Sequence, residues 1–171
     1  MKMKKKTTLY LAQAAVIAAM YTALTYILQP ISFSGSQLRV SEALTILPAL
    51  TPAAVPALTI GCFLSNLASP FGAIDIVLGT AATFLAAICS HFTRNVKIKG
   101  LPVLSAFFPV LFNAIFVGLS IAIMNEGGFT WGFFAITALS VALGEAIVCF
   151  AMGLPLYKII EKTKIFSDKD K

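Results

Sequence analysis

The segment of residues 41–68, SEALTILPALTPAAVPALTIGCFLSNLA, decides how many membrane-crossing segments this chain is expected to have. It is almost entirely apolar, and a helix needs about 20 residues to cross the hydrocarbon of a bilayer. The segment is therefore too long for one crossing and short for two. Pro48, Pro52 and Pro56 also interrupt it, because proline lacks the backbone N–H of a continuous helix. We expect a pair of short helices joined by a tight turn near Thr51–Pro52.

The composition of the whole chain places that segment in a membrane. Of 171 residues, 58% are hydrophobic and 12% are charged, and the mean hydropathy is +0.90. A soluble domain averages about 25% charged residues, so a chain of this composition cannot cover its surface with polar side chains. The composition predicts an all-α integral membrane protein whose residues 1–171 form a single membrane domain.

The basic residues indicate how the crossings are arranged. They gather in residues 2–6, in residues 94–99 and in the tail 158–171, as is typical of cytoplasmic flanks. If residues 2–6 and 94–99 share one side, an even number of crossings separates them. The run 41–68 must then cross twice, or enter the bilayer and return. The first apolar run is longer than the core of a signal peptide, so we expect it to be retained as a helix.

These arguments predict a six-helix transmembrane bundle with both termini in the cytoplasm. Its second and third helices are short and interrupted by proline. Such broken helices line cavities more often than they face lipid. The expected segments are residues 8–28, 41–51, 52–68, 73–92, 101–124 and 132–157.

Polar residues precede the second helix, where this topology places the outer face. Gln37, Arg39 and Glu42 lie within six residues of one another, between two apolar runs. Arg39 and Glu42 are three apart and could pair at the start of a helix. Ser41 is a candidate N-cap, and Glu42 in the first turn would complement the helix dipole. This local explanation leaves Gln37 and Arg39 unexplained, so we also consider a binding or gating role.

Other polar residues fall at or near the same outer end. Asn66 ends the third segment, and Asp75 begins the fourth, where it could instead serve the helix dipole. Asn113 lies near the middle of the fifth segment, and either asparagine could simply bond between helices. Trp131 begins the sixth segment, where an interface anchor is an alternative to a ligand contact.

Glu145 is the only charged residue between Trp131 and Tyr157. A carboxyl in the middle of a membrane helix costs about 2.5–3.5 kcal/mol, and such residues face a bundle interior or a cavity. It lies about 20 Å from the outer end of its helix. We therefore expect either a helix-pairing role or a cavity that opens outward, with Asn113 and Glu145 at its floor.

The first segment carries small residues at a spacing of four. Such a stripe lets another helix pack closely, within this chain or in a partner. Its members are Ala14, Ala15, Ala18, Ala19 and Ala23.

No catalytic or energy-converting motif accompanies these features. The chain lacks a Gly-x-x-x-x-Gly-Lys-Ser/Thr phosphate loop and has no His/Cys cluster. Cys62, Cys89 and Cys149 lie singly in apolar runs, and the one histidine is His91. We expect no catalytic residue, no metal and no cofactor, so an intramembrane enzyme is disfavoured.

Three motifs resemble the QueT family. They are QLRVSEALTILPAL at 37–50, FLSNLASPFGAIDIVLGTAATFLAA at 63–87, and GEAIV with GLPLY between 144 and 157, and the resemblance covers residues 8–160. It implies the substrate-binding subunit of an energy-coupling factor (ECF) transporter for queuosine precursors in a bacterial plasma membrane, with six helices and an outward-facing pocket. The alanine stripe would then dock on a transmembrane coupling subunit, which two cytoplasmic ATPases drive.

The ligands that this resemblance implies are 7-deazaguanines: the nitrile or aminomethyl precursors, or the base queuine. Their ring offers adjacent N–H donors to a carboxylate and a carbonyl to an amide or N–H donor, and an aromatic ring can cover its face. The carboxylates of Asp75 and Glu145 are the leading candidates to bind the donors. The other candidate contacts are Phe33, Gln37, Arg39, Glu42, Asn66, Asn113 and Trp131.

Two alternatives remain open at this point. The same architecture could carry another vitamin-like nutrient, and only the motif at 37–50 argues against it. A stand-alone proton-coupled carrier could use Glu145 as its titrating group.

Overall fold

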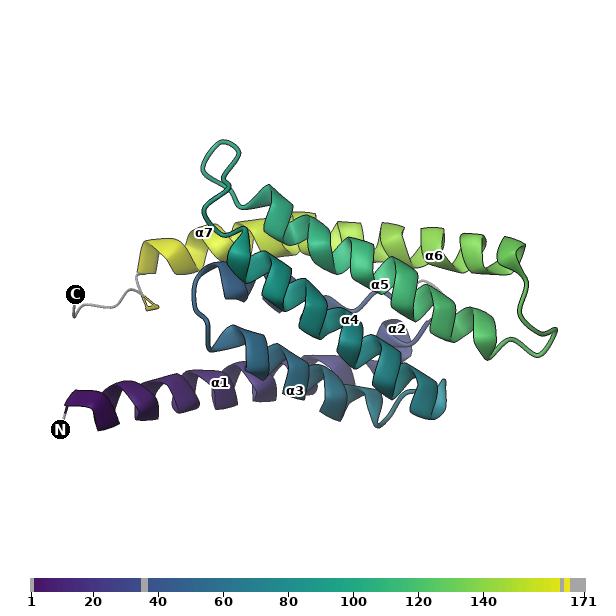
Figure 1. Cartoon of the computed structure of the whole chain (residues 1–171), viewed down its shortest axis with the longest axis horizontal. Helices are drawn as coiled ribbons and strands as arrows, with labels where there is room; N and C mark the ends of the chain where they lie inside the picture. Colours follow the sequence, from purple (N-terminus) through teal and green to yellow (C-terminus); the bar gives the residue numbers. More distant parts are fainter. Residues whose placement is uncertain (1, 35–36, 164, 167–171) are drawn as a thin grey trace.

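The computed structural model describes residues 2–34, 37–163 and 165–166, and within that part the elements are helical apart from one bridge between Ile98 and Leu101 (Figure 1). Four helices are long and apolar enough to cross a membrane. They are α1 (Lys2–Ile27), α4 (Gly72–Phe92), α5 (Val103–Ile123) and the continuous run α6 (Trp131–Ala146), η2 (Ile147–Gly153) and α7 (Leu154–Thr163). The expected all-helical chain is confirmed.

The apolar segment 41–68 forms two shorter helices, as its prolines predict. They are η1 (Val40–Ala49) and α3 (Ala54–Asn66). The four-residue α2 (Gln29–Ser32) precedes them, in a stretch expected to be a loop. The first and last helices also extend beyond the expected 8–28 and 132–157, because α1 continues into the lysine run and α7 continues to Thr163.

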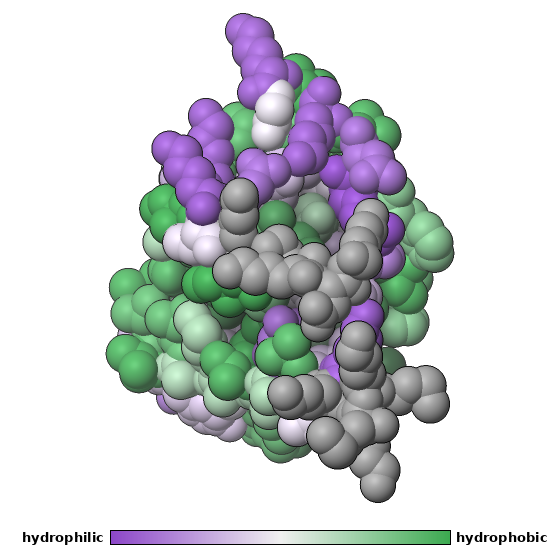
Figure 2. All heavy atoms as spheres, turned by 90° about the vertical axis from the view of Figure 1, so that its left-hand side faces the viewer, coloured by the Kyte–Doolittle hydropathy of each residue, from purple (hydrophilic) through white to green (hydrophobic). Residues whose placement is uncertain are grey.

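The basic parts of the chain lie together at one end of the bundle. Figure 1 shows the start of α1, the loop of residues 93–102 and the end of α7 at this end, together with the turn between η1 and α3. Figure 2 views this end directly, and hydrophilic side chains gather over its upper part. We call it the basic end. The short α2 and the loops 67–71 and 124–130 lie at the opposite end (Figure 1).

The short helix η1 forms the centre of the bundle. Every residue from Ser41 to Ala49 is buried, and α1, α3, α4, α5, η2 and α7 all pack against it. Leu44 and Leu47 join a core with α1, α3 and α4, whereas Ile46 faces α5 and α7. A 3₁₀-helix of ten residues is unusual, since such runs rarely exceed four residues. Packing on all sides, rather than local preference, stabilises it.

Proline and threonine determine the turn at residues 50–53. The backbone N–H groups of Leu50 and Thr51 both bond to the Leu47 carbonyl, at 2.8 and 2.9 Å, and close η1. Pro52 has no N–H to continue that helix. Pro56 lies in the first turn of α3, where its missing N–H would have had no helical partner anyway. The expected turn at Thr51–Pro52 is confirmed.

Glycines allow two helix pairs to approach closely. A Cβ on Gly61 of α3 would lie 3.0 Å from the Tyr21 Cβ and 3.1 Å from the Ala18 carbonyl of α1. A Cβ on Gly118 of α5 would lie 2.8 Å from the Ala138 Cα of α6. The Thr137 hydroxyl donates to the Gly118 carbonyl at 3.0 Å beside this contact. Backbone contact of this kind is how membrane helices associate.

We predict that Gly118→Ala destabilises the protein by about 1–3 kcal/mol, because the added methyl overlaps the α6 backbone, which cannot move aside without breaking the α5–α6 contact. A thermal unfolding midpoint measured in detergent checks this.

Gly132→Ala is the matched control, because a Cβ at Gly132 meets nothing within 4 Å. It should leave the midpoint unchanged or raise it slightly, since alanine favours helix over glycine. Equal midpoints for the two variants would contradict the close approach of α5 and α6.

Candidate functional site

Polar side chains from several helices gather inside the half of the bundle opposite to the basic end. They come from the start of η1 and the stretch before it, the end of α3, the start of α4, and the facing positions of α5 and α6. Each is at most 3% exposed: Gln37, Arg39, Glu42, Asn66, Asp75, Asn113 and Glu145. The structure therefore buries the polar and charged candidates that the sequence suggested, whereas Phe33 is half-buried and Trp131 is exposed. We call these seven residues the polar cluster.

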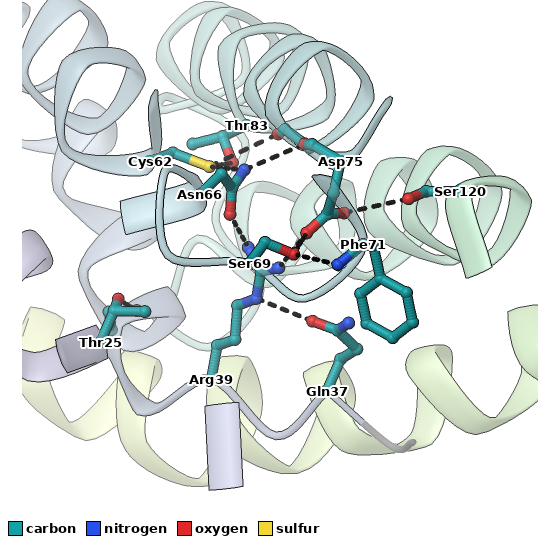
Figure 3. A network of polar contacts seen from close by, with 12 residues as sticks. Thr25, Gln37, Arg39, Cys62, Asn66, Ser69, Phe71, Asp75, Thr83 and Ser120 are labelled. Atoms are coloured by element: carbon teal, nitrogen blue, oxygen red, sulfur yellow. Dashed lines mark hydrogen bonds and ion pairs between the residues drawn. The ribbon is translucent and has the colours of Figure 1, made fainter. Parts of the chain in front are cut away.

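Arg39 occupies the middle of one part of the cluster, as Figure 3 shows. Its Nε donates to Gln37 Oε1 at 3.0 Å. Its Nη1 donates to Asn66 Oδ1 at 2.9 Å, and its Nη2 pairs with Asp75 Oδ2 at 3.3 Å. The guanidinium also lies over the Phe33 ring, 5.0 Å from its centre. All three guanidinium nitrogens therefore have partners, as burial of this cation requires.

Both oxygens of Asp75 are occupied by groups of the protein. Oδ1 accepts from the Ser120 hydroxyl at 3.2 Å, and Oδ2 accepts from the Ser69 hydroxyl at 2.5 Å in addition to Arg39 (Figure 3). Asp75 lies in the first turn of α4, as expected. Its carboxylate is therefore best explained as the counter-ion of Arg39.

Asn66 connects α3 to α4 beside this ion pair. Its Nδ2 donates to the Asp75 carbonyl at 3.2 Å and contacts Cys62 Sγ at 3.4 Å. A Cβ on Gly79 would lie 2.6 Å from that Nδ2, so only glycine leaves room for the amide here. Because its amide oxygen accepts from Arg39, the orientation of the Asn66 side chain is fixed.

Glu42 has a different environment from the one its spacing suggested. The expected pairing with Arg39 is wrong, because the guanidinium reaches Asp75 instead, and Glu42 Oε1 accepts the Tyr21 hydroxyl of α1. The expected N-cap is also wrong. Arg39 precedes η1 without a side-chain cap, and the Ser41 hydroxyl bonds to Thr25 at 2.7 Å. Glu42 does lie in the first turn of η1.

Glu145 and Asn113 lie on the other side of Glu42. Cys149 connects the two acids, since its Sγ lies 3.7 Å from Glu145 Oε2 and 3.8 Å from the Glu42 carbonyl. The side chain of Asn113 lies beside both carboxyls. The π-helical segment η2 begins two residues after Glu145, and such segments are frequent at functional sites.

Within the part of the chain that the structure describes, two side-chain atoms of the polar cluster are buried and have no hydrogen-bond partner. They are Gln37 Nε2 and Glu42 Oε2. Arg39 can only donate, so its bond to Gln37 Oε1 leaves the amide nitrogen as the free group. Tyr21 occupies the other oxygen of Glu42. An unpaired buried polar atom costs about 1–3 kcal/mol, and a missing ligand or water is one explanation.

Gln37 also has an uncommon backbone conformation. Its φ is 47°, in the left-handed region that residues other than glycine rarely adopt. Its side chain is nevertheless only 1% exposed. Gln37 therefore combines an uncommon backbone conformation with a buried amide that has only one of its two polar atoms hydrogen-bonded. Backbone strain of this kind is concentrated at functional sites.

Two features of the site differ from the sequence-based expectation. The cluster is closed, because its side chains are buried rather than arranged around a cavity that opens outward. Trp131 is 76% exposed and packs edge-to-face on Phe129 and Phe134, so it does not join the cluster. Its position fits the alternative of an interface anchor.

Three hydroxyl residues that the sequence did not single out complete the site. Tyr21 binds Glu42, while Ser69 and Ser120 bind Asp75. In the sequence, these residues are distinguished only by a hydroxyl group within or beside an apolar run. The residue that each hydroxyl contacts depends on how α1, α4 and α5 pack.

The alanines of α1 divide into two faces. Ala14 and Ala18 pack toward the core shared with α3, where Ala18 lies against Gly61. Ala15, Ala19 and Ala23 are exposed. The stripe therefore contributes to packing within the chain on one face and remains uncovered on the other.

Within the described residues, no three His, Cys, Asp or Glu side chains are grouped so as to hold a metal ion.

We predict that Arg39→Met destabilises the protein by about 3–5 kcal/mol, because it leaves Asp75 charged and buried without its partner. Adding Asp75→Leu to Arg39→Met should restore part of the lost stability, since the double variant no longer buries an unpaired carboxylate. Unfolding midpoints of the single and double variants in detergent test this.

Lys97→Met provides the comparison at an exposed ion pair. Lys97 lies 2.8 Å from Glu161, and the side chains are 38% and 43% exposed. Its loss should cost less than about 1 kcal/mol. If Arg39→Met and Lys97→Met lowered the free energy of unfolding by similar amounts, the result would contradict a stabilising role for the buried Arg39–Asp75 pair.

Comparison with known proteins identifies the family of this chain. The family model described as QueT transporter matches residues 11–162. The queuosine precursor transporter QueT of Lactococcus lactis subsp. cremoris (strain MG1363) is 30% identical over 155 residues, which cover 84% of this chain and 87% of that protein. No solved structure matches. Since the family model spans most of the chain, including the whole polar cluster, this protein belongs to the QueT transporter family.

Proposed function

We propose that this protein is the substrate-specificity subunit of an ECF-type transporter, and that its polar cluster binds a 7-deazaguanine precursor of queuosine. The observation that carries the proposal is the pair of unpartnered buried atoms, the Gln37 amide nitrogen and one Glu42 oxygen. The family and the name of the lactococcal relative supply the substrate class.

The two free atoms match the edge of a guanine-like base. A carboxylate oxygen accepts from a ring N–H or an amino group, and an amide N–H donates to the ring carbonyl. Glu42 would supply the acceptor and Gln37 the donor. A hydrogen bond that involves an ionised group is roughly twice as strong as a neutral one.

The contacts within the cluster distinguish its carboxylates. Asp75 already accepts from Ser69, Ser120 and Arg39, so we no longer expect it to contact the base. Glu145 contacts Cys149 weakly, at 3.7 Å, and with Asn113 it forms the far wall of the cluster. We assign the donor edge of the base to Glu42 and Glu145.

The proposed topology has six crossings within one membrane domain. Two of them are η1 and α3, which are short but run between the two ends of the bundle beside the long helices (Figure 1). The positive-inside rule would place the basic end in the cytoplasm, together with both termini. The polar cluster would then lie nearer the outer face, from which the substrate enters.

We further propose that the protein docks on a membrane coupling subunit through the exposed face of α1, formed by Ala15, Ala19 and Ala23. Small residues at this spacing permit close helix contact in lipid. Two cytoplasmic ATPases would then drive uptake, which agrees with the absence of a phosphate-binding loop from the sequence.

The direct test is a thermal-shift panel on the purified protein in detergent, with 7-deazaguanines, guanine and common vitamins. Ligand at 100 times its Kd stabilises the fold by about 2.7 kcal/mol. A shift confined to the deazaguanines supports the proposal. A shift with a vitamin alone would retain the binding role but replace the substrate.

We predict that Glu42→Gln weakens deazaguanine binding by about 10- to 100-fold. Tyr21 would bond to the remaining oxygen, and the new amide would direct a donor at the donors of the base. Titration by thermal shift measures this. Glu126→Gln, at an exposed residue of the loop 124–130, is the matched control and should bind normally; equal affinity in both variants would exclude Glu42 as a contact.

We predict that Ala19→Trp abolishes co-purification of the coupling subunit without changing the deazaguanine thermal shift, because the indole prevents close helix contact. Ala135→Trp, on an exposed face of α6, is the control and should retain the partner.

Uptake of labelled precursor by proteoliposomes distinguishes the coupling mechanism. ATP-dependent uptake with the coupling subunit and ATPases supports the proposal. Uptake by this chain alone, driven by a proton gradient, would overturn the ECF assignment and favour a proton-coupled carrier.

A further inference from the structure

The polar cluster contains more acidic groups than basic ones. Its ionisable members are one cation, Arg39, and three carboxyls, Glu42, Asp75 and Glu145. Among the side chains that the structure describes, Arg39 is the only buried cation. Any further compensation of the buried carboxyls must therefore come from a proton or from a ligand.

The charge of Arg39 is already balanced by Asp75. Their Nη2 and Oδ2 atoms lie 3.3 Å apart, and the other described ion pair lies at the basic end. Glu42 and Glu145 therefore have no cationic side chain within 4.0 Å in the described part of the chain. Arg39 acts on both of these acids only at longer range.

The two uncompensated acids belong to facing helices and influence each other. Glu42 lies in η1 and Glu145 in α6, and their carboxyls are close enough to repel each other. The thiol of Cys149 contacts Glu145 Oε2 and the Glu42 carbonyl, but it carries no positive charge. Two close carboxyls in an apolar interior do not both remain ionised unless a cation joins them. The pair therefore needs a positive charge that the described side chains do not supply.

The hydrogen bonds that the cluster lacks occur beside the same pair. Within the described residues, Glu42 Oε2 and Gln37 Nε2 are buried and have no partner. The N–H donors of a guanine-like base lie side by side, so a single carboxylate can accept from both. Glu42 has this capacity, because Tyr21 occupies one of its oxygens and leaves the other open. Glu145 is then available for another part of the ligand.

We propose that the ligand of the polar cluster carries a positive charge on the substituent of its base, and that Glu145 binds this charge. The inference rests on the proposed function and divides the roles of the two acids: Glu42 accepts from the ring, and Glu145 selects the substituent. An alkyl amine is protonated at neutral pH, as the lysine side chain is, whereas a nitrile is neutral. The site therefore prefers the amine-bearing precursors, the aminomethyl form and queuine, to the nitrile form.

Two ligands that differ in charge but hardly in size test this inference. They are 7-aminomethyl-7-deazaguanine and 7-hydroxymethyl-7-deazaguanine, and calorimetric titration of the whole chain in detergent measures their Kd values. We expect the aminomethyl base to bind about 10- to 100-fold more tightly, because a hydrogen bond to a charged group is stronger than a neutral one. Equal affinity for the two bases would overturn the proposal and show that protons compensate the acids.

Variants of Glu145 test the assignment of the charge to this residue. Glu145→Gln should reduce the preference for the aminomethyl base about tenfold by weakening that ligand alone. Glu145→Asp keeps the charge and should retain part of the preference. Glu126→Gln, at an exposed residue, is the matched control and should retain all of it. Binding of the hydroxymethyl base shows that each variant is folded, and an undiminished preference in Glu145→Gln would overturn the role of Glu145.

Unsubstituted 7-deazaguanine separates failure of this inference from failure of the proposed function. If it binds as tightly as the aminomethyl base, the substituent contributes nothing and the inference fails, while the proposed function stands. If none of the three bases binds, the proposed function fails, and this inference fails with it.

Discussion

Burial of the Arg39 guanidinium is the constraint on which this structure depends. A cation inside an apolar bundle is tolerated only when its donors are satisfied and its charge is balanced. Asp75 balances the charge, while Asn66 and Gln37 accept the remaining bonds. These partners come from the start of α4, the end of α3 and the stretch before η1. One side chain therefore fixes how three separate elements meet, and Gly79 leaves room for Asn66 among them.

The same constraint divides the polar cluster into two parts. Around Arg39 and Asp75 the hydrogen bonds are nearly complete, so this part supports the fold. Around Glu42 a carboxylate oxygen finds no partner among the described residues, and Glu145 contacts Cys149 weakly and lies beside Asn113. Gln37 belongs to the first part through its amide oxygen, which Arg39 holds, while its amide nitrogen is left free. A selective binding site requires ligand-contacting groups that rigid neighbours hold in place. Here the hydrogen-bonded residues around Arg39 would orient the groups around Glu42 that still lack partners.

Irregular helices place the acids of the unsatisfied part. Glu42 lies in a 3₁₀-helix that all its neighbours bury, and Glu145 lies two residues before a π-helical segment. Both conformations are less stable locally than an α-helix and persist because the surrounding structure packs against them. Cys149 of the π-helical segment contacts both Glu145 and the Glu42 backbone. The deviations from regular helix therefore coincide with the proposed ligand contacts.

The sequence by itself determined the helical class, the short helices within 41–68 and the turn at Thr51–Pro52, because apolar length and proline chemistry act locally. It also indicated all seven residues of the polar cluster, since a charge or an amide within or beside an apolar run demands an explanation. Only the tertiary structure decided which groups pair. Spacing along a helix favoured Arg39 with Glu42, but packing brings Arg39 to Asp75 and Tyr21 to Glu42. Packing also exposes Trp131 and turns Ala18 inward while Ala19 faces outward. Partner choice depends on the distances between helices, which no local pattern specifies.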